Sequence, residues 1–301
     1  MNQVNISDLG NYAGEEVTVK GWVYTTRSIG KIWFVILRDG TGLVQCVVVK
    51  EETDDETFNL ESILTQESSV IITGTVREEA RSVGGFELGV NSIQINQISE
   101  EYPISPKEHG TDFLMNHRHL WIRSKLQHAI LRVRHQVIKA SRDFFDQNGF
   151  ILVDSPIFTA NAVEGTTSLF EVGYFDRSAY LTQSGQLYQE AGAMAFGKVY
   201  CFGPTFRAEK SKTRRHLTEF WMIEPEIAFC DLEQDMDWAE KYVSYIVQWC
   251  LEHCKTDLET LDRDVSTLEK VATPFPRITY DDAVEILKKN GVDFEYGGDF
   301  G

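Results

Sequence analysis

Short runs in which apolar and polar residues alternate fill the first hundred residues, and turn residues separate them. Alternation with a period of two is typical of strands that bury one face. The predicted strands are residues 15–24, 31–38, 43–49, 69–76 and 86–95. A helical run at residues 57–64 lies between the third and the fourth strand. The pattern therefore predicts a small domain of five strands and one helix over residues 1–100.

This order of five strands, with one helix after the third, fits the OB-fold, a small Greek-key barrel whose open face binds oligonucleotides. Another kind of small β-barrel is compatible with the same pattern. We expect an N-terminal OB-fold barrel over residues 1–100.

Polar residues and two prolines, Pro103 and Pro106, interrupt the pattern after the barrel, so residues 101–119 are interpreted as a linker. Apolar residues then recur at helical spacing over residues 120–147, and the Asn-Gly pair at 148–149 is suited to end a helix. The residues expected on the buried face of this helix are Leu126, Ile130, Val133, Val137 and Phe144.

The rest of the chain alternates between strand and helix patterns. Strands are expected around Leu169, Val199 and Met222, and helices at residues 186–195, 232–253 and 281–290. Thr279 precedes the last helix as a capping residue. Residues 120–301 are therefore expected to form a second domain, an antiparallel sheet flanked by helices, and the chain as a whole is expected to be a multidomain α+β protein.

The charge of the chain restricts its partners. The formal net charge is -17. Proteins that attract nucleic acid in bulk are usually basic, so this charge argues against DNA binding and requires any RNA contact to be local. One such local stretch is residues 201–220, which carry five Lys and Arg against two Asp and Glu.

Five cysteines are scattered along the chain: Cys46, Cys201, Cys230, Cys250 and Cys254. Their odd number, without a signal-peptide pattern, indicates a reduced intracellular compartment. No apolar run approaches the roughly 20 residues of a membrane span, so we expect a cytoplasmic protein. Cys250 and Cys254 flank His253 and invite a metal-site interpretation, but no second ligand pair follows, which favours buried apolar cysteines.

The densest chemical signal is a strand that ends near Arg207, a basic loop, and a returning strand that contains Phe220. A guanidinium binds phosphate oxygens in a bidentate manner, and an aromatic ring stacks on a purine. Two antiparallel strands that carry these groups would form a nucleotide clamp. The alternative is a surface hairpin whose charges are only solvated.

Residues 203–226, which begin GPTFRAE and end EFWMIEPE, closely resemble motif 2 of asparaginyl-tRNA synthetases and resemble that of aspartyl enzymes less well. The resemblance implies that Arg207 contacts the α-phosphate of ATP and the carboxylate of the amino acid, and that Phe220 stacks on the adenine. It implies further ATP contacts at Glu209, Arg215, His216 and Leu217.

Upstream, residues 149–156, GFILVDSP, resemble motif 1, the helix and strand through which class II synthetases form dimers. This implies a homodimer with Pro156 at the interface, although an ordinary edge-strand proline is the alternative. Glu164 matches the glutamate of the flexible loop that closes over the amino acid in this family, where it would bind the substrate ammonium.

Residues 183–190, QSGQLYQE, resemble the segment that lines the amino-acid pocket, which implies contacts at Gln186, Gln189 and Glu190. In aspartyl enzymes a lysine typically takes the place of Gln189 and neutralises the substrate carboxylate. The neutral side chain of asparagine is matched better by an amide and a carboxylate than by a buried ammonium. The alternative is that Gln189 faces away from the ligand.

In the barrel, Trp33 and Phe34 point to opposite faces of one strand, so one of them is expected in the core. The resemblance to related anticodon-binding barrels implies that Phe34 stacks on the central anticodon base and that Gln45 reads the edge of that base. It also implies a phosphate or base-edge contact for Arg27. A core position for Phe34 is the alternative.

Motif 3, the glycine-rich segment ending in an arginine that closes the active site of class II synthetases, has no counterpart up to Gly301. The acidic residues that hold magnesium in the family are likewise not found, so we assign no metal ligand within this chain. We interpret the sequence as an asparaginyl-tRNA synthetase whose catalytic core is incomplete, and we expect the 301 residues alone to be inactive.

Taken together, the resemblance implies a ligase that joins L-asparagine to tRNA(Asn) through an asparaginyl-adenylate, with ATP and Mg²⁺, and that reads the anticodon with its barrel. Two alternatives stay open. One is a non-catalytic tRNA-binding protein that keeps the barrel, and the other is an aspartyl-tRNA synthetase.

Overall fold

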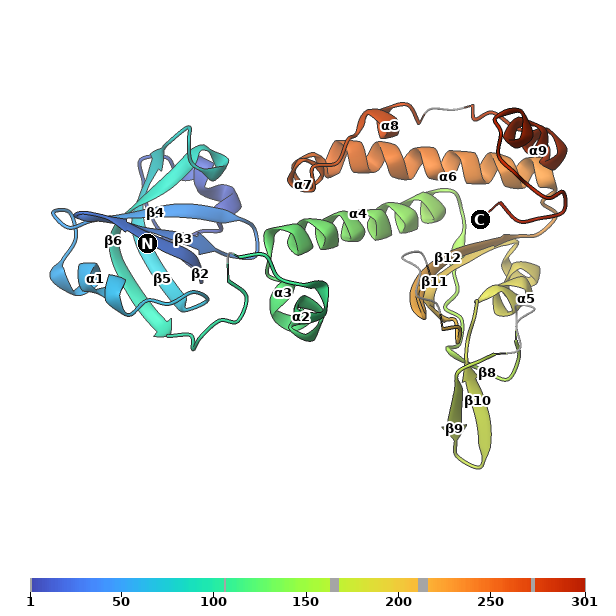
Figure 1. Ribbon diagram of the computed structural model, residues 1–301, viewed down its shortest axis with the longest axis horizontal. Coiled ribbons are helices and arrows are strands. Elements are labelled where there is room, and N and C mark those ends of the chain that lie inside the picture. Colours follow the sequence, from blue (N-terminus) through green and yellow to red (C-terminus); the bar gives the residue numbers. More distant parts are fainter. Residues whose placement is uncertain (1, 106, 163–167, 211–215, 272–273, 301) are drawn as a thin grey trace. The chain divides into compact units, whose positions relative to one another are not determined.

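The computed structural model describes residues 2–105, 107–162, 168–210, 216–271 and 274–300 and divides into two compact units, Met1–Trp121 and Ile122–Gly301 (Figure 1). Two of the predicted site residues, Glu164 and Arg215, lie outside the described residues. Within the described residues, no helix is both long and apolar enough to cross a bilayer.

The sheet of the first unit has the strand order β1-β2-β3-β4-β6-β5, and β2 pairs with β5 as well. The strands are β1 (Asn2–Gln3), β2 (Glu16–Ile29), β3 (Ile32–Arg38), β4 (Leu43–Val49), β5 (Ser69–Glu78) and β6 (Phe86–Gln97). Because β2 pairs with both β3 and β5, the last five strands close into a barrel, which confirms the expected OB-fold. The two-residue strand β1 was not predicted, since so short a strand has no periodic pattern.

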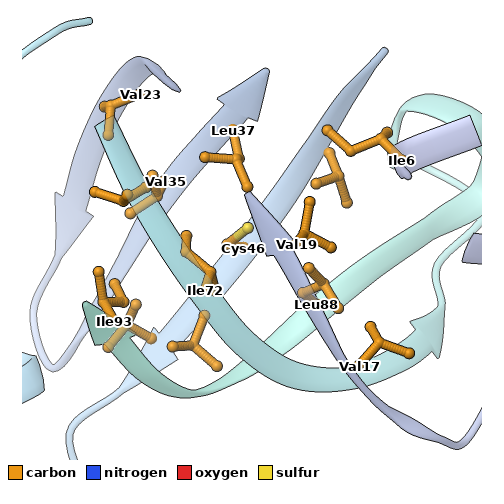
Figure 2. Close-up of a cluster of buried hydrophobic side chains, with 14 of the residues drawn as sticks. Ile6, Val17, Val19, Val23, Val35, Leu37, Cys46, Ile72, Leu88 and Ile93 are labelled. Carbon is orange, nitrogen blue, oxygen red and sulfur yellow. The ribbon is translucent and has the colours of Figure 1, made fainter. Parts of the chain in front are cut away.

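Alternation along the strands builds the barrel core. In β3 the side chains of Trp33, Val35 and Leu37 are fully buried and the residues between them are not. Figure 2 shows side chains from different strands, among them Val19 and Ile72, converging in the barrel interior. Trp33 is therefore the core residue of the neighbouring aromatic pair.

The helix predicted at residues 57–64 is α1 (Asp55–Asn59) followed by the 3₁₀ turn η2 (Leu60–Ser62). It begins earlier than expected because the Asp54 side chain accepts the backbone N–H of Thr57 and caps the first turn. Two further 3₁₀ helices are η1 (Ile6–Tyr12) and η3 (Val83–Gly85).

The predicted linker, residues 101–119, is not entirely irregular. It contains α2 (Thr111–Asn116), and α3 (Arg118–Trp121) follows directly. Neither helix contains a buried residue, so the sequence has no apolar periodicity there from which these helices could be predicted.

The second unit contains two small sheets and six helices among its described residues. Its elements are α4 (Lys125–Gln147), β7 (Ile151–Leu152), β8 (Phe158–Thr159), β9 (Glu171–Tyr174), β10 (Arg177–Leu181), α5 (Gln186–Phe196), β11 (Lys198–Phe206), β12 (Glu219–Ile227), α6 (Leu232–His253), α7 (Lys255–Thr260), α8 (Ser266–Glu269) and α9 (Tyr280–Lys289). One sheet has the order β8-β10-β9 and is antiparallel. The other has the order β12-β11-β7 and is mixed, because β7 runs parallel to β11, whereas an antiparallel sheet was expected.

The long helix predicted from residue 120 begins only at Lys125, because the side chain of Ser124 accepts the N–H of Gln127 and starts α4 there. Its predicted end is confirmed, with Gly149 at φ 78°. The predicted buried face was partly wrong, since Leu126 is 55% and Ile130 44% exposed. The side of the helix that faces away from solvent instead carries the small residue Ala129 together with Val133 and Val137. This is the side along which α6 and α7 pack.

Three later helices lie within one residue of their predicted bounds, and Thr279 accepts the N–H of Asp282 as the expected cap of α9. Val199 and Met222 lie in strands as expected. Leu169 does not, because β9 begins only at Glu171.

Helices cover both faces of the β11-β12 pair. On one face, α4 and α6 lie side by side (Figure 1) and bury Phe144, Phe145 and Tyr200 with Tyr242 packed against them. On the other face lies α5, where the space beside Gly192 is filled by Val199 of β11. Cys250 and Cys254 are buried in a separate apolar cluster with Leu258, as the apolar interpretation of these cysteines predicts.

Candidate nucleotide, amino-acid and RNA sites

The strand pair β11-β12 brings together the two groups that the sequence assigned to ATP. Thr205 pairs with Phe220 in the antiparallel register, and the N–H of Arg207 donates to the carbonyl of Thr218 at 3.0 Å. The guanidinium carbon of Arg207 lies 6.0 Å from the centroid of the Phe220 ring. A cation and an aromatic ring therefore share one end of this strand pair, as a nucleotide clamp requires.

Glu209, His216 and Leu217 lie on the segments that lead into and out of residues 211–215. All three side chains are exposed, so a ligand at this end of the strand pair could reach them.

Helix α5 places its three predicted pocket residues on different sides. The amide Nε2 of Gln186 donates to Glu190 Oε1 at 3.0 Å, and both side chains are exposed. Gln189 is fully buried, and its Nε2 donates to Ser155 Oγ at 2.9 Å and to the carbonyl of Val153. Its Oε1 is buried without a hydrogen-bond partner among the described residues. The structure therefore joins Gln186 to Glu190 and separates Gln189 from both.

A carboxylate that sequence reasoning did not single out fixes the start of α5. Glu224 of β12 accepts the N–H of Gly185 at 2.9 Å, the hydroxyl of Ser184, and the thiol of Cys201 at 3.5 Å. A side chain on Gly185 would not fit, because its Cβ would lie 2.7 Å from Cys201 Sγ. The signal for this contact is the strand register, which pairs Cys201 with Glu224 and is not visible in the linear sequence.

The segment before α5 is also tied to the Arg207 end of β11. The N–H of Phe206 donates to the carbonyl of Thr182 at 2.8 Å. Because Phe206 directly precedes Arg207, the residues that begin α5 and the predicted phosphate-binding arginine are held on one hydrogen-bonded framework.

Acidic groups accumulate on the α5 face of the sheet. Burial raises the pKa of Glu226, and the neighbouring carboxylates of Glu190 and Glu224 raise it further. Burial, followed by the charge of Glu224, also raises the pKa of the Cys201 thiol to about 12. This face therefore suits a positively charged or amide-donating ligand group.

A cavity of about 290 Å³ lies along β11 beside this framework. Its lining includes Arg142, Asp154, Ser155, Gly185, Cys201 and Glu224. Among the described residues, none of those that the sequence assigned to ATP or to the amino acid lines it. Pro156, assigned to the dimer interface, is exposed in the segment between β7 and β8.

In the barrel, all three predicted anticodon residues meet on the outer face. Arg27 and Phe34 are paired across β2 and β3, and the Arg27 guanidinium carbon lies 4.6 Å from the Phe34 ring centroid. The same guanidinium donates to Gln45 Oε1 at 3.2 Å. Phe34 is half-buried and points away from the core that holds Trp33, so its position favours the anticodon role over the core alternative.

Glu87 of β6 completes this set and was missed from the sequence. Gln45 Nε2 donates to Glu87 Oε2 at 3.1 Å across the parallel β4-β6 pair. The two bonds of Gln45 fix its amide, with the oxygen toward Arg27 and the nitrogen toward Glu87. No local pattern links residues so far apart in the chain, so only the closed barrel reveals the contact.

Comparison with known families assigns both units. Residues 17–96 match the family model of the OB-fold nucleic acid binding domain, and residues 110–298 match that of the tRNA synthetases class II (D, K and N). The chain is 58% identical over 301 residues to the asparagine–tRNA ligase of Pelotomaculum thermopropionicum, covering 100% of this chain and 70% of that protein. It is 59% identical over 296 residues to the asparagine–tRNA ligase of Desulforamulus reducens, covering 98% of this chain and 69% of the relative.

Among solved structures, the asparaginyl-tRNA synthetase of Pyrococcus horikoshii in complex with asparaginyl-adenylate superimposes with a TM-score of 0.94 at 42% identity, covering 100% of this chain and 70% of that chain. The fold, the motif residues and the similarity over nearly the whole of this chain lead to one conclusion. The chain belongs to the class II tRNA synthetases, within the asparagine–tRNA ligase family.

Proposed function

We propose that this protein joins L-asparagine to tRNA(Asn) through an asparaginyl-adenylate formed from ATP. The observation that carries the proposal is the meeting of Arg207 and Phe220 at one end of the β11-β12 pair, on the framework that also holds the start of α5. The adenylate bound to the Pyrococcus horikoshii relative supports it.

In the first step, a carboxylate oxygen of asparagine attacks the α-phosphorus of ATP in line, and the bond to the bridging oxygen breaks to release pyrophosphate. Arg207 would bind an α-phosphate oxygen and the attacking carboxylate, while Phe220 stacks on the adenine. Glu209, Arg215, His216 and Leu217 would hold the rest of the nucleotide. The chemistry needs positioning and charge stabilisation rather than a covalent protein intermediate.

In the second step, a ribose hydroxyl at the end of the tRNA attacks the carbonyl carbon of the adenylate, an ester forms, and AMP leaves with the electrons of the broken bond. The chain holds the adenylate in place through Arg207 during this transfer. No side chain needs to change its covalent state.

Magnesium would enter together with the ATP phosphates, which it usually binds with few protein carboxylates. In the part of the chain that the structure describes, no three His, Cys, Asp or Glu side chains are grouped to hold a metal ion. We derive no step through the ion.

The amino acid would bind beside α5. Gln186 and Glu190 form an exposed amide and carboxylate pair, and together with Glu164 they would receive the ammonium and the carboxamide of asparagine. Gln189 would act from the buried side of the helix. It is neutral, so the pocket lacks the positive charge that a lysine provides at this position in aspartyl enzymes. These contacts favour asparagine over aspartate.

The barrel would bind the anticodon loop, with the central base stacked on Phe34 and its edge read by Gln45. An amide with a fixed direction offers one donor and one acceptor, which hydrogen bonding needs to select a base, whereas stacking accepts any base. Arg27, whose guanidinium lies over the Phe34 ring in this structure, would move aside for the base and contact RNA at the margin of the stack. We also propose a homodimer through the segment around Pro156, which light scattering in solution would test.

The catalytic proposal is tested by asparagine-dependent exchange of pyrophosphate into ATP, measured on the 301-residue chain and on any longer product of the same gene. In the active form, Arg207→Ala is expected to reduce exchange by about 100-fold or more, the usual effect of removing a group that stabilises transition-state charge. Arg263→Ala, which removes an exposed arginine elsewhere in the same unit, is the control for charge. Exchange in none of the forms, with tRNA binding retained, would favour the non-catalytic alternative.

The anticodon proposal is tested by binding of a tRNA(Asn) transcript to the same chain. Loss of one stacked base costs about 1 to 3 kcal/mol, so Phe34→Ala should weaken binding by roughly 5-fold to 150-fold. Phe34→Leu keeps the apolar volume without the aromatic face and should lose nearly as much, while Phe34→Tyr should retain affinity. Equal affinity for all three variants would refute anticodon reading by this ring.

A further inference from the structure

A second arginine, Arg77 of β5, lies on the same outer face of the barrel as the three predicted anticodon residues. The strand registers establish this, because Gln45 pairs with Glu87 and Glu87 pairs with Arg77. Paired residues of neighbouring strands point to the same side of a sheet. The adjacent residues Leu88 and Val76 are buried in the barrel core, so Arg77 points outward with Gln45.

The guanidinium of Arg77 lies flat against Gly89 of β6. A Cβ atom on Gly89 would lie 2.4 Å from Arg77 Cζ, 2.5 Å from Nε and 2.6 Å from a terminal nitrogen. No other residue type could stand at position 89 without displacing this group. Gly89 is thus a cradle that fixes the plane of the guanidinium on the barrel surface.

The exposed edge of this guanidinium already binds an oxyanion. A terminal nitrogen of Arg77 donates to Glu52 Oε2 at 3.0 Å, with 45% of the Arg77 side chain and 54% of the Glu52 side chain exposed. A pair this open to solvent is weak, so a better oxyanion can replace the carboxylate. A backbone phosphate carries the same single negative charge as the carboxylate and can accept two parallel hydrogen bonds from a guanidinium, whereas Glu52 accepts only one from a terminal nitrogen of Arg77.

The distance to Phe34 places Arg77 beside the stacked base. Phe34 pairs with Val47, and Val47 pairs with Gly89, so two strand spacings, roughly 10 Å, separate Phe34 from the Gly89 cradle. Phe34, Val47 and Gly89 therefore form a row across three neighbouring strands. Arg27 lies over Phe34 at one end of the row, and Arg77 lies over Gly89 at the other end. In a chain with a formal net charge of -17, these two arginines on one outer face supply the local positive charge that RNA binding by the barrel would need.

We propose that Arg77, held on Gly89, binds a backbone phosphate of the anticodon loop next to the nucleotide that stacks on Phe34, and that this phosphate displaces Glu52. The proposal rests on the proposed anticodon-reading function of the barrel. It assigns Gly89 as the positioning residue for the guanidinium and Glu52 as the anion that occupies the site without RNA.

The test measures the Kd of the 301-residue chain for a tRNA(Asn) transcript over a series of KCl concentrations. Arg77→Ala should weaken binding about 10-fold, and the slope of log K against log salt should become shallower by about 0.7, the value for one phosphate contact to a single strand. Arg81→Ala is the matched control, because it removes the same charge from a side chain that is 95% exposed beyond the end of the strand. The control should change Kd by less than 2-fold.

Gly89→Ala separates position from charge. It changes no charge, and the three atoms nearest to the added Cβ all belong to the flexible end of Arg77, so it should weaken binding nearly as much as Arg77→Ala. The double variant Gly89→Ala/Arg77→Ala should bind like Arg77→Ala alone, since both remove one interaction. Glu52→Gln should tighten binding more than Glu51→Gln, whose carboxylate pairs with Lys31 instead.

Equal Kd values for Arg77→Ala and Arg81→Ala, or unchanged binding in Gly89→Ala, would overturn the Arg77 contact. So would equal effects of Glu52→Gln and Glu51→Gln. The Phe34→Ala variant separates this failure from that of the proposed function. Loss of binding in Phe34→Ala with full binding in Arg77→Ala overturns only the phosphate site, whereas full binding in both overturns anticodon reading by this face.

Discussion

Replacing Glu67 by glutamine should destabilise the barrel by about 3 kcal/mol. The Glu67 carboxylate accepts two hydrogen bonds from the Arg38 guanidinium, at 2.7 and 2.9 Å. The side chain of Glu67 is 3% exposed and that of Arg38 15% exposed. Breaking a buried ion pair by removing one charge costs roughly 3 to 5 kcal/mol, because the remaining buried charge loses the opposite charge that offset its desolvation. Glutamine keeps the shape and one acceptor oxygen, which places the expected cost at the lower end.

The exposed pair Lys31-Glu51 of the same barrel provides the control. Its side chains are 71% and 70% exposed, and solvent screens such a pair so that it contributes little to stability. Glu51→Gln makes the same chemical change as Glu67→Gln and should leave the free energy of unfolding nearly unchanged. The difference between the two variants therefore isolates the effect of burial.

Hydrogen exchange of the backbone amides of β3 and β4 measures the stability of the barrel by itself. The slowest amides of a unit exchange through its cooperative opening, so their rates report its free energy of unfolding. A loss of about 3 kcal/mol corresponds to exchange about 150-fold faster in Glu67→Gln. Equal acceleration in Glu67→Gln and Glu51→Gln would refute the argument that burial decides the strength of the pair.

Three further outcomes are expected. Gln189→Lys should reduce asparagine-dependent pyrophosphate exchange by the active form at least about 10-fold, because it buries an ammonium where a neutral amide now lies; unchanged discrimination against aspartate would contradict the pocket assignment. Iodoacetamide at pH 8 should modify Cys230 first in the folded chain, because it is the one partly exposed cysteine, and early modification of Cys201 detected by mass spectrometry would contradict this burial. The hydrogen bond from Arg277 lowers the pKa of Asp237, so this carboxylate contributes stability above its ordinary pKa of 3.8 that is lost as the pH falls through the lower folded value; Arg277→Ala should therefore lower the melting temperature at pH 6 more than at pH 2.5.

The helices show where sequence reasoning was limited. The bounds of α6 followed from its apolar period, and Thr279 was found as the cap of α9, because both signals are local. The start of α4 was missed although Ser124, three residues before Gln127, is a local capping signal, because the predicted helix was extended back to residue 120 across the turn at Ile122 and Arg123. The predicted buried face of α4 differs from the observed one because the packing of α6 and α7 sets the rotation of the helix about its axis. The sequence of α4 alone does not show which helices will pack against it.

The candidate sites divide in the same way. Arg207, Phe220, Arg27, Phe34 and Gln45 could be named from the sequence, because its resemblance to asparaginyl-tRNA synthetases and to related anticodon-binding barrels implies them. Glu87 and Glu224 could not, since each acts through a partner in another strand or loop, 42 residues away for Gln45 and 39 residues away for the N–H of Gly185. Gln189 was named, but its complete burial became visible only when α5 was packed on the sheet.

The sequence by itself determined the strands of the barrel, the main helices of the second unit and the family, because periodicity and motif spacing are properties of neighbouring residues. The tertiary structure alone decided the register of β4 with β6, the cradle of Arg77 on Gly89 and the framework around Glu224. These depend on which strands meet and how they are aligned. That alignment minimises the free energy of the whole barrel or sheet at once, so no short stretch of sequence encodes it.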